Sequence, residues 1–348
     1  MTKLRKSNNK HNNKRNNNKI NNKRKTKKRQ RKKPIRMRKN NKRGNNKRKT
    51  NKIHYYGNKK FKKESCAPKK KGESLSYTCF TPDNLQKLKN LWNKRHPDRP
   101  IKGNNSKQIW ENLKYAMNNT CSRETCWINE QMKTTDDDDS NVLGNLKKSF
   151  APKQPDSWKK KPNTWLNSTD ILKVMKQYED AYDCFEFIGP TPIDFDDHMH
   201  DGRCVWEELC EFELEKEIRE KKKKIGIIFN LDPHYKGGSH WVAMFINIKK
   251  KEICYFDSYG EIPPRRIKKL AMRIVGQSNA LPADLKAYKN FKFVSCSKRH
   301  QYSNSECGVY SLYFIIQLLT DKKNSEYFST HRIPDNFIKK FRNKYFNK

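Results

Sequence analysis

One segment near the end of the chain is apolar on every side of its helical projection. Residues 308–319 read Gly-Val-Tyr-Ser-Leu-Tyr-Phe-Ile-Ile-Gln-Leu-Leu. A helix of this kind has to be buried in the middle of a fold, because no face of it suits water. The residues just before it, 300–306, are polar, and Cys307 stands at the junction. The sequence therefore predicts a fold built around a central helix, with a polar loop leading to its N-terminus.

Cys307 is the first candidate for chemistry. The N-terminus of a helix has free N–H groups and the positive end of the helix dipole, and both favour a thiolate. The alternative is an inert buried cysteine, which is common in protein cores. That alternative does not account for the polar loop before Cys307. We therefore interpret Cys307 as a candidate nucleophile.

A base and its orienting carboxylate are found upstream. Residues 240–248 are typical of a strand, residues 249–251 are three lysines that suit a turn, and residues 252–260 return as a second strand. A hairpin of this length places Asp257 within about one register step of His240. Histidine can act as a base, and a carboxylate can orient its imidazole. Spacing alone leaves four other histidines open as the base: His198, His200, His234 and His300.

The ordered set of these residues resembles a known superfamily. His240-Trp241, Asp257 seventeen residues after His240, and Gln301-x5-Cys307-Gly308 are similar to the SUMO-protease and adenovirus-protease superfamily of cysteine peptidases. Trp165-Leu166-Asn167 looks like the motif that opens that domain, so the resemblance covers Trp165 to residue 348. Glu306 departs from the SUMO-protease pattern, in which Asp usually precedes the cysteine.

Among the members of this superfamily, the chain looks most like the processing proteases of large nucleocytoplasmic DNA viruses, of the African swine fever virus and mimivirus type. Those proteases carry a helical N-terminal part. They also have segments similar to Cys121-x4-Cys126-Trp127 and to residues 187–195 of this chain.

The resemblance implies a role for each site residue. It implies Cys307 as nucleophile, His240 rather than the other histidines as base, Asp257 as the residue that orients it, and Gln301 as an oxyanion donor. It also implies that Trp165 and Trp241 flank a narrow tunnel for a Gly-Gly substrate end, since two aromatic walls leave room for backbone only. Core packing is the alternative role for both tryptophans.

The implied function is a cysteine endopeptidase that matures viral structural precursor polyproteins during particle assembly. We then expect it in the virion and in the cytoplasmic viral factory, with the nucleus also open. One alternative is a protease that removes SUMO or another ubiquitin-like modifier from host proteins. The other is a non-enzymatic, DNA-binding virion protein.

Charge divides the chain into unequal parts. The net charge is +42, and residues 1–60 hold 27 Lys/Arg and 15 Asn with no Asp or Glu. So few apolar residues occur there that no core can form, and we expect a disordered tail. Such a tail binds polyanions through counterion release, which predicts nucleic acid as a partner. The alternatives are a nuclear-import signal and a merely solubilising tail.

Patterning along the rest of the chain predicts an α+β fold with a central mixed sheet and surrounding helices. We assign 1–72 to the basic tail, 73–132 to a helical extension, 133–163 to a linker and 164–348 to the protease domain. Residues 189–192, Gly-Pro-Thr-Pro, are typical of a rigid loop, and the charged stretch 204–224 favours helix.

No run of eighteen apolar residues predicts a membrane span, and no apolar signal-peptide core begins the chain. The ten cysteines lack the paired regularity of a secreted disulfide framework, so we expect a reducing compartment. Cys121-x4-Cys126 lacks a second ligand pair, and His198-x-His200 is isolated. We therefore expect no bound metal. We also expect a monomer with no cofactor and no membrane contact.

Overall fold

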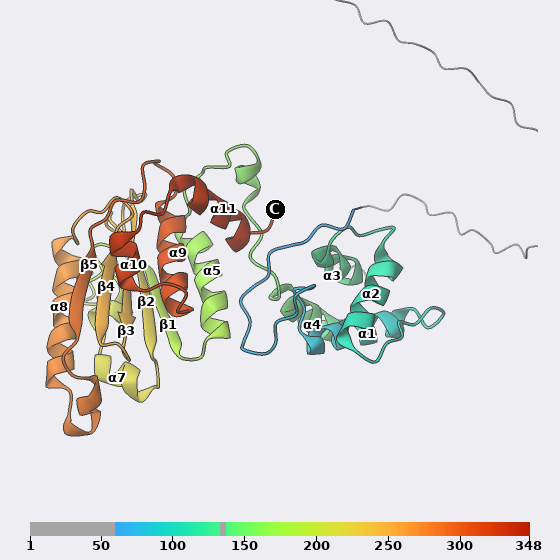
Figure 1. The fold of residues 1–348 in the computed structure, drawn as a ribbon, viewed down its shortest axis with the longest axis horizontal. Helices are drawn as coiled ribbons and strands as arrows, with labels where there is room; N and C mark the ends of the chain where they lie inside the picture. Colours follow the sequence, from blue (N-terminus) through green and yellow to red (C-terminus); the bar gives the residue numbers. More distant parts are fainter. Residues whose placement is uncertain (1–59, 133–136) are drawn as a thin grey trace, which may run out of the picture. The chain divides into compact units, whose positions relative to one another are not determined.

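The computed structural model describes residues 60–132 and 137–348 (Figure 1). Its elements follow one another in this order: α1 (Pro82–Arg95), α2 (Ser106–Met117), α3 (Glu124–Met132), α4 (Asp137–Lys147), η1 (Asp156–Lys159), α5 (Ser168–Ala181), β1 (Phe185–Pro192), α6 (Glu207–Cys210), α7 (Leu214–Arg219), β2 (Lys224–Asn230), β3 (Trp241–Asn247), β4 (Glu252–Phe256), α8 (Arg265–Ala280), η2 (Ala283–Tyr288), β5 (Lys292–Cys296), α9 (Cys307–Leu319), α10 (Ser325–Thr330) and α11 (Asp335–Tyr345). The predicted α+β class is confirmed.

A mixed five-stranded sheet positions the site. Its strand order is β1-β2-β3-β4-β5, with β2, β3 and β4 antiparallel and the two outer strands parallel to their neighbours. In the β3–β4 hairpin, Ala243 pairs with Phe256. The start of β3 and the end of β4 therefore meet at one edge of the sheet.

Both faces of the sheet are covered. Along β3, Ala243 and Phe245 pack into a cluster with α5, α9 and α11, whereas Val242 and Met244 join a second cluster with α7 and α8. Side chains alternate between the faces of a strand, so one strand serves both cores. Figure 1 shows α8 on one side of the sheet and α5, α9 and α10 on the other.

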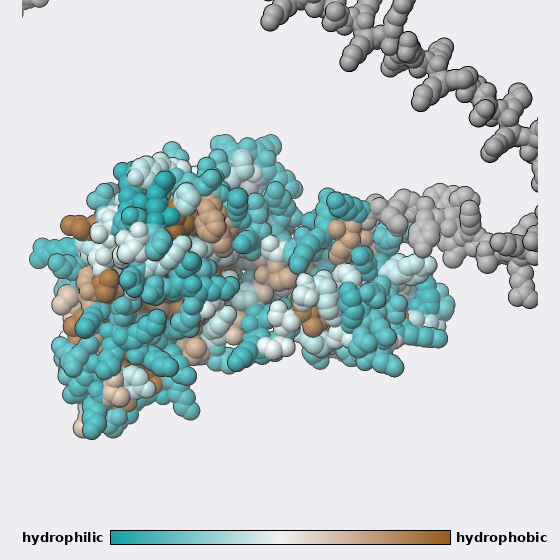
Figure 2. Space-filling model, in the orientation of Figure 1, coloured by the Kyte–Doolittle hydropathy of each residue, from teal (hydrophilic) through white to brown (hydrophobic). Residues whose placement is uncertain are grey.

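The apolar segment behaves as the sequence predicts. Every residue of α9 is buried, and the helix packs on β3. On the face shown in Figure 2, hydrophobic residues form scattered patches in a mostly hydrophilic surface. Most large apolar side chains of the protease domain are thus used in its two cores.

The loop expected at residues 189–192 is instead the end of strand β1. Thr191 and Pro192 pair with Phe229 and Asn230, after a register shift that follows Ile188. The strand tolerates its prolines because β1 is an edge strand, where a missing N–H on the free side interrupts no ladder. The Gly189–Pro190 peptide bond is cis.

The helix expected over 204–224 is also incorrect in extent. Only two short helices form there, α6 and α7, and the chain between them turns inward at Phe212 and Leu214. Burial of these two apolar side chains in the α8 cluster outweighs the local preference for one continuous helix.

Residues on either side of the predicted helical extension belong to its core. Phe61, from the expected tail, and Leu143 and Leu146 of α4, from the expected linker, pack with the apolar residues of α1, α2 and α3. Helix α4 begins at Asp137, within the expected linker. The side chains of Thr81 and Asn105 cap the N-termini of α1 and α2.

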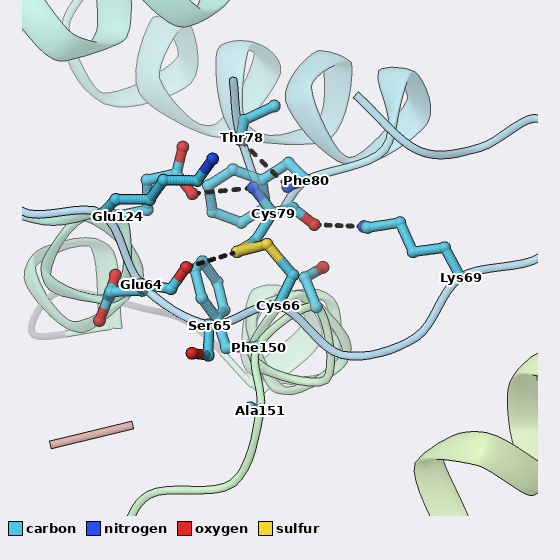
Figure 3. The surroundings of a disulfide bond; sticks show 12 residues. Glu64, Ser65, Cys66, Lys69, Thr78, Cys79, Phe80, Glu124, Phe150 and Ala151 are labelled. Carbon is cyan, nitrogen blue, oxygen red and sulfur yellow. Dashed lines mark hydrogen bonds between the residues drawn. A yellow bond between two sulfur atoms is a disulfide. The ribbon is translucent and has the colours of Figure 1, made fainter. Parts of the chain in front are cut away.

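Figure 3 shows the Cys66–Cys79 disulfide, which joins two segments at the start of this helical part of the chain. The Cys79 N–H donates to the buried carboxylate of Glu124 at 3.0 Å, which ties the segment before α1 to α3. Burial raises the pKa of Glu124, although hydrogen bonds from Cys79, Thr78 and Trp110 oppose the rise.

Two further disulfides join Cys121 to Cys126 and Cys204 to Cys210. The sequence spacing predicted no such pairing. The free cysteines among the described residues are Cys184, Cys254, Cys296 and Cys307. Residues 1–59 of the predicted tail 1–72 lie outside the described residues. Over the described ranges, no helix has the length and apolar character needed to cross a membrane.

Candidate active site

The nucleophile candidate lies where the sequence predicts. α9 begins at Cys307, and this residue is 2% exposed. A Cβ on the next residue, Gly308, would lie only 3.0 Å from the Cβ of Leu166, so glycine permits a close approach of the two segments. The loop that carries Trp165 and Leu166 is thereby held beside the thiol.

The predicted proximity of His240 and Asp257 is confirmed. His240 immediately precedes β3, Asp257 immediately follows β4, and Nε2 of the imidazole lies 2.7 Å from Oδ1 of the carboxylate. Asp257 is buried, and its Oδ1 also accepts the backbone N–H of Tyr259 at 2.8 Å. This second bond fixes the carboxylate in the position that orients the imidazole.

His240 also interacts with the side chain of Cys307, which contributes to the raised pKa of the imidazole. Nε2 of His240 is engaged by Asp257, so Nδ1 is the ring nitrogen that remains available to the Cys307 sulfur. Burial disfavours the charged imidazole, but hydrogen bonds to Asp257 and Cys307, together with their charges, outweigh burial and raise the pKa of His240 to about 9. The raised pKa favours the imidazolium form of His240 at neutral pH, which places a positive charge beside Cys307.

Tyr259 is a member of the site that the sequence analysis did not single out. Its ring stacks on the imidazole of His240 with centroids 4.8 Å apart and planes 20° apart. Its hydroxyl donates to the carbonyl of Ser303 at 3.2 Å. The ring limits rotation of His240, and the hydroxyl links the histidine side of the site to the Gln301 loop.

Gln301 is buried and held by several bonds. Its backbone N–H donates to the carbonyl of Ser258 at 2.8 Å, and the Ser258 hydroxyl donates to its side-chain Oε1 at 2.7 Å. Nε2 donates to the carbonyl of Ser303 at 2.7 Å and makes a longer contact, 3.4 Å, with the hydroxyl of Tyr259. The longer contact is the weaker one, so this N–H is the donor that a substrate oxygen could claim.

The loop of Gln301 is fixed from α11 by Asp335. This carboxylate accepts the backbone N–H groups of Tyr302, at 3.1 Å, and Ser303, at 3.2 Å. It also accepts the hydroxyl of Tyr310 on α9, at 3.1 Å. One carboxylate thus joins the oxyanion loop, the nucleophile helix and the C-terminal helix.

A buried ion pair lies directly behind the nucleophile. Glu306 is fully buried, and its Oε2 lies 3.1 Å from the guanidinium of Arg342 on α11. Arg342 also donates to the carbonyl of Thr164, at 2.7 Å, next to Trp165. The departure from the usual Asp therefore has a structural partner. The sequence feature that could have indicated this ion pair is Arg342, because it is a charged residue on the apolar stripe of Ile338 and Tyr345.

The other histidines have different partners. His300 is buried, accepts the N–H of Ile333 at Nδ1 (3.1 Å) and lies 3.0 Å from the carbonyl of Phe328 at Nε2. Burial lowers its pKa to about 4, so it is neutral at ordinary pH. His234 pairs with Asp194 at 2.7 Å.

The two tryptophans differ in exposure. Trp165 is 43% exposed, whereas Trp241 is 5% exposed and its indole N–H donates to the carbonyl of Leu166 at 2.8 Å. Trp241 therefore anchors the segment that carries Trp165. Trp241 is one of the residues that line a cavity of about 530 Å³. Met199, Val205, Trp206 and His234 also line it. The two-walled tunnel stays a prediction.

Comparison with known proteins agrees with this geometry. Residues 160–348 match the family model described as the Ulp1 protease family, C-terminal catalytic domain. The chain belongs to the Ulp1 protease family. This confirms the superfamily inferred from the His, Asp, Gln and Cys pattern.

Two relatives come from mimivirus and African swine fever virus. A thiol protease of Acanthamoeba polyphaga mimivirus is 34% identical over 160 residues, which cover 46% of this chain and 49% of the relative. A SUMO-1 cysteine protease of African swine fever virus is 32% identical over 130 residues, which cover 36% of this chain and 45% of the relative. The matches thus span about half of each relative.

A crystal structure of an African swine fever virus protease shares the fold. Its TM-score is 0.55 with 22% sequence identity, and the alignment covers 81% of this chain and 95% of that one. At this identity the likeness supports the Ulp1-type fold and carries no information on substrate.

Proposed function

We propose that this protein is a cysteine endopeptidase. The observation that supports this most directly is the 2.7 Å contact of His240 with Asp257, together with the effect of Cys307 on the pKa of His240. In this mechanism the Cys307 thiolate attacks the scissile carbonyl, and the His240 imidazolium protonates the leaving amine. Gln301 and the Cys307 backbone N–H stabilise the oxyanion. Water then hydrolyses the thioester, with His240 accepting its proton.

The proposed cleavage site follows a Gly-Gly pair. Trp165 is exposed on the segment that Gly308 and Trp241 hold beside the thiol. An aromatic wall so close to the nucleophile disfavours substrates with side chains just before the cut. Trp241 contributes the anchor of that wall and one end of the adjoining cavity.

The proposed substrates are viral structural precursors that are cut during particle assembly. The two viral relatives favour this class. The second candidate is a ubiquitin-like modifier joined to a host protein, which the printed name of the swine fever virus relative favours. The basic segment 1–60 would hold the enzyme on nucleic acid in the viral factory or virion.

The test compares cleavage of three substrates by the full chain: a fluorogenic Gly-Gly peptide, a SUMO precursor, and Gly-Gly-containing virion precursors. The same peptide with Ala in place of the first Gly is the matched control for selectivity. Cys307→Ala is the control for the enzyme. Cleavage of virion precursors alone supports the first candidate, and cleavage of SUMO alone supports the second. Cleavage that persists in Cys307→Ala would refute the peptidase proposal.

A further inference from the structure

Three potential metal ligands meet in the segment between β1 and α7, two before α6 and one at its last residue. The imidazole of His198 and the sulfurs of Cys204 and Cys210 offer ligand atoms that all lie within 4.8 Å of one another. Sequence spacing alone did not join them, because His198-x-His200 is isolated and the two cysteines follow only later. The structure pairs His198 with Cys204 across a tight antiparallel bridge.

The spacing of the first two ligand atoms suits a tetrahedral zinc ion. Nε2 of His198 lies 3.6 Å from Sγ of Cys204. With Zn–S of about 2.3 Å and Zn–N of about 2.0–2.1 Å, tetrahedral angles place the two ligand atoms about 3.6 Å apart. Imidazole and thiolate are also the ligand types that zinc takes in proteins.

Backbone hydrogen bonds hold this arrangement independently of the disulfide. The N–H of Met199 donates to the carbonyl of Arg203 at 2.8 Å, and the N–H of Val205 donates to the carbonyl of Asp197 at 2.9 Å. Arg273 of α8 donates to the carbonyl of Cys210 at 2.8 Å, which anchors the third ligand from another helix. Breaking the disulfide therefore leaves all three ligands on fixed backbone.

We propose that the reduced form of this loop binds a zinc ion through His198, Cys204 and Cys210. A dithiol reductant supplies two electrons to the Cys204–Cys210 bond and is itself oxidised to a disulfide, which leaves two protein thiols. Zinc binding then displaces a proton from each thiol. Three protein ligands leave the fourth position to water. His198 is exposed, so the ion has an entry path.

The location gives this site a role at the cavity that Trp241 helps to line. Met199, Val205 and Trp206, which lie between the ligands in sequence, line the cavity that begins at Trp241. A zinc ion would fix that wall in the reduced protein, as the disulfide does in the oxidised protein. This consequence rests on the proposed peptidase function, but zinc binding itself does not.

The test is a cobalt titration of the full chain, reduced and handled without oxygen. Tetrahedral Co²⁺ bound to thiolate gives characteristic absorption, and added Zn²⁺ should remove it as it takes the site. We expect the absorption in the wild type, its loss in the Cys204→Ser/Cys210→Ser variant, and a weakened or altered spectrum in His198→Gln. Because His198 is exposed, its substitution leaves the core intact.

The chain offers a matched control in Cys121→Ser/Cys126→Ser, which removes the other short-range cysteine pair and should retain the absorption. Elemental analysis should find bound zinc in the wild type and in this control, less zinc in His198→Gln, and none at this site in the Cys204→Ser/Cys210→Ser variant. Absence of the cobalt spectrum in the reduced wild type would overturn the proposal. So would a spectrum that depends on Cys121 and Cys126, or one unchanged in His198→Gln. Peptidase assays are not needed for any of these outcomes.

Discussion

At the scale of single residues, the site depends on how one imidazole is placed between a carboxylate and a sulfur. The hairpin predicts the first contact, because a short turn fixes which residues of its strands meet. The helix start predicts where the thiol lies. Tyr259 could not be predicted, because its stacking on His240 depends on the backbone path after Asp257 and not on any spacing in the sequence.

Replacing Gln301 tests the oxyanion role. Gln301→Ala should lower kcat by about 10²–10³ with little change in KM, because the lost donor acts mainly on charge that develops in the transition state. Steady-state kinetics on a Gly-Gly peptide provide the measurement, with the exposed Gln86→Ala as control. A rise in KM alone would make Gln301 a binding residue instead.

The pKa of His240 predicts a pH-dependent stability. The folded value, about 9, lies above the ordinary value of 6.5, so the folded state holds the proton more tightly. This stabilisation is fully present below pH 6.5 and is lost as the pH rises through about 9. The free energy of unfolding of the wild type should exceed that of His240→Gln by on the order of 1–3 kcal/mol at the lower pH.

Urea unfolding at several pH values between 5.5 and 9.5 measures this difference, with the exposed His331→Gln as control. The difference between wild type and His240→Gln should shrink with rising pH, whereas the control should show no comparable trend. A difference that grows with pH would contradict the charge state proposed for His240.

At the scale of elements, α11 holds the loops of the site in place. The sequence predicted the helix from its apolar spacing, but it could not predict that Asp335 and Arg342 contact residues about thirty positions earlier. Those contacts depend on how α11 packs against α9. The β1 strand could not be predicted either, because two prolines are typical of loops and only its edge position accommodates them.

Removing Arg342 should destabilise the fold strongly. Arg342→Met leaves the charge of Glu306 buried without a partner, which costs about 3–5 kcal/mol. Adding Glu306→Gln should recover part of that loss, since a neutral amide is easier to bury. Denaturant unfolding of the Arg342→Met variant and of the double variant measures both changes in the free energy of unfolding. Arg219→Met, at an exposed pair with Glu215, should cost less than about 1 kcal/mol. If the effects of Arg342→Met and Glu306→Gln on the free energy of unfolding simply added, the two side chains would not be energetically coupled.

Glycine at position 308 should be required for the geometry of the site. Gly308→Ala forces its Cβ against Leu166 and should cost about 1–3 kcal/mol of stability, with a larger loss of kcat/KM as the Trp165 segment moves. Gly276→Ala in α8 is the matched control, since nothing lies within 4 Å of the added Cβ, and it should be neutral or stabilising. Equal effects of the two substitutions would contradict the close-packing role.

At the scale of the whole molecule, the prediction concerns the segment with no acidic residues. A chain that lacks residues 1–60 retains Phe61 and with it the core of the helical extension. We expect it to fold and to cleave short peptides normally. Its affinity for DNA should be much lower, and the affinity of the full chain should fall steeply with salt as each neutralised phosphate releases a counterion.

A salt titration of DNA binding by both proteins measures this prediction. Little sequence preference is expected, because an unstructured run of Lys and Arg has no fixed geometry for reading base edges. A flat salt response in the full chain, or equal affinity in the two proteins, would assign the segment to import or solubility.

The position of Asp335 and Arg342 in the chain has a consequence for synthesis. Chains grow from the N-terminus and their parts fold as they emerge. His240, Asp257, Gln301 and Cys307 are all made before the two residues of α11 that hold the Gln301 loop and Glu306. A nascent chain thus contains its full reactive set before it contains the supports. We therefore expect the reactive set to become active only after translation has passed α11.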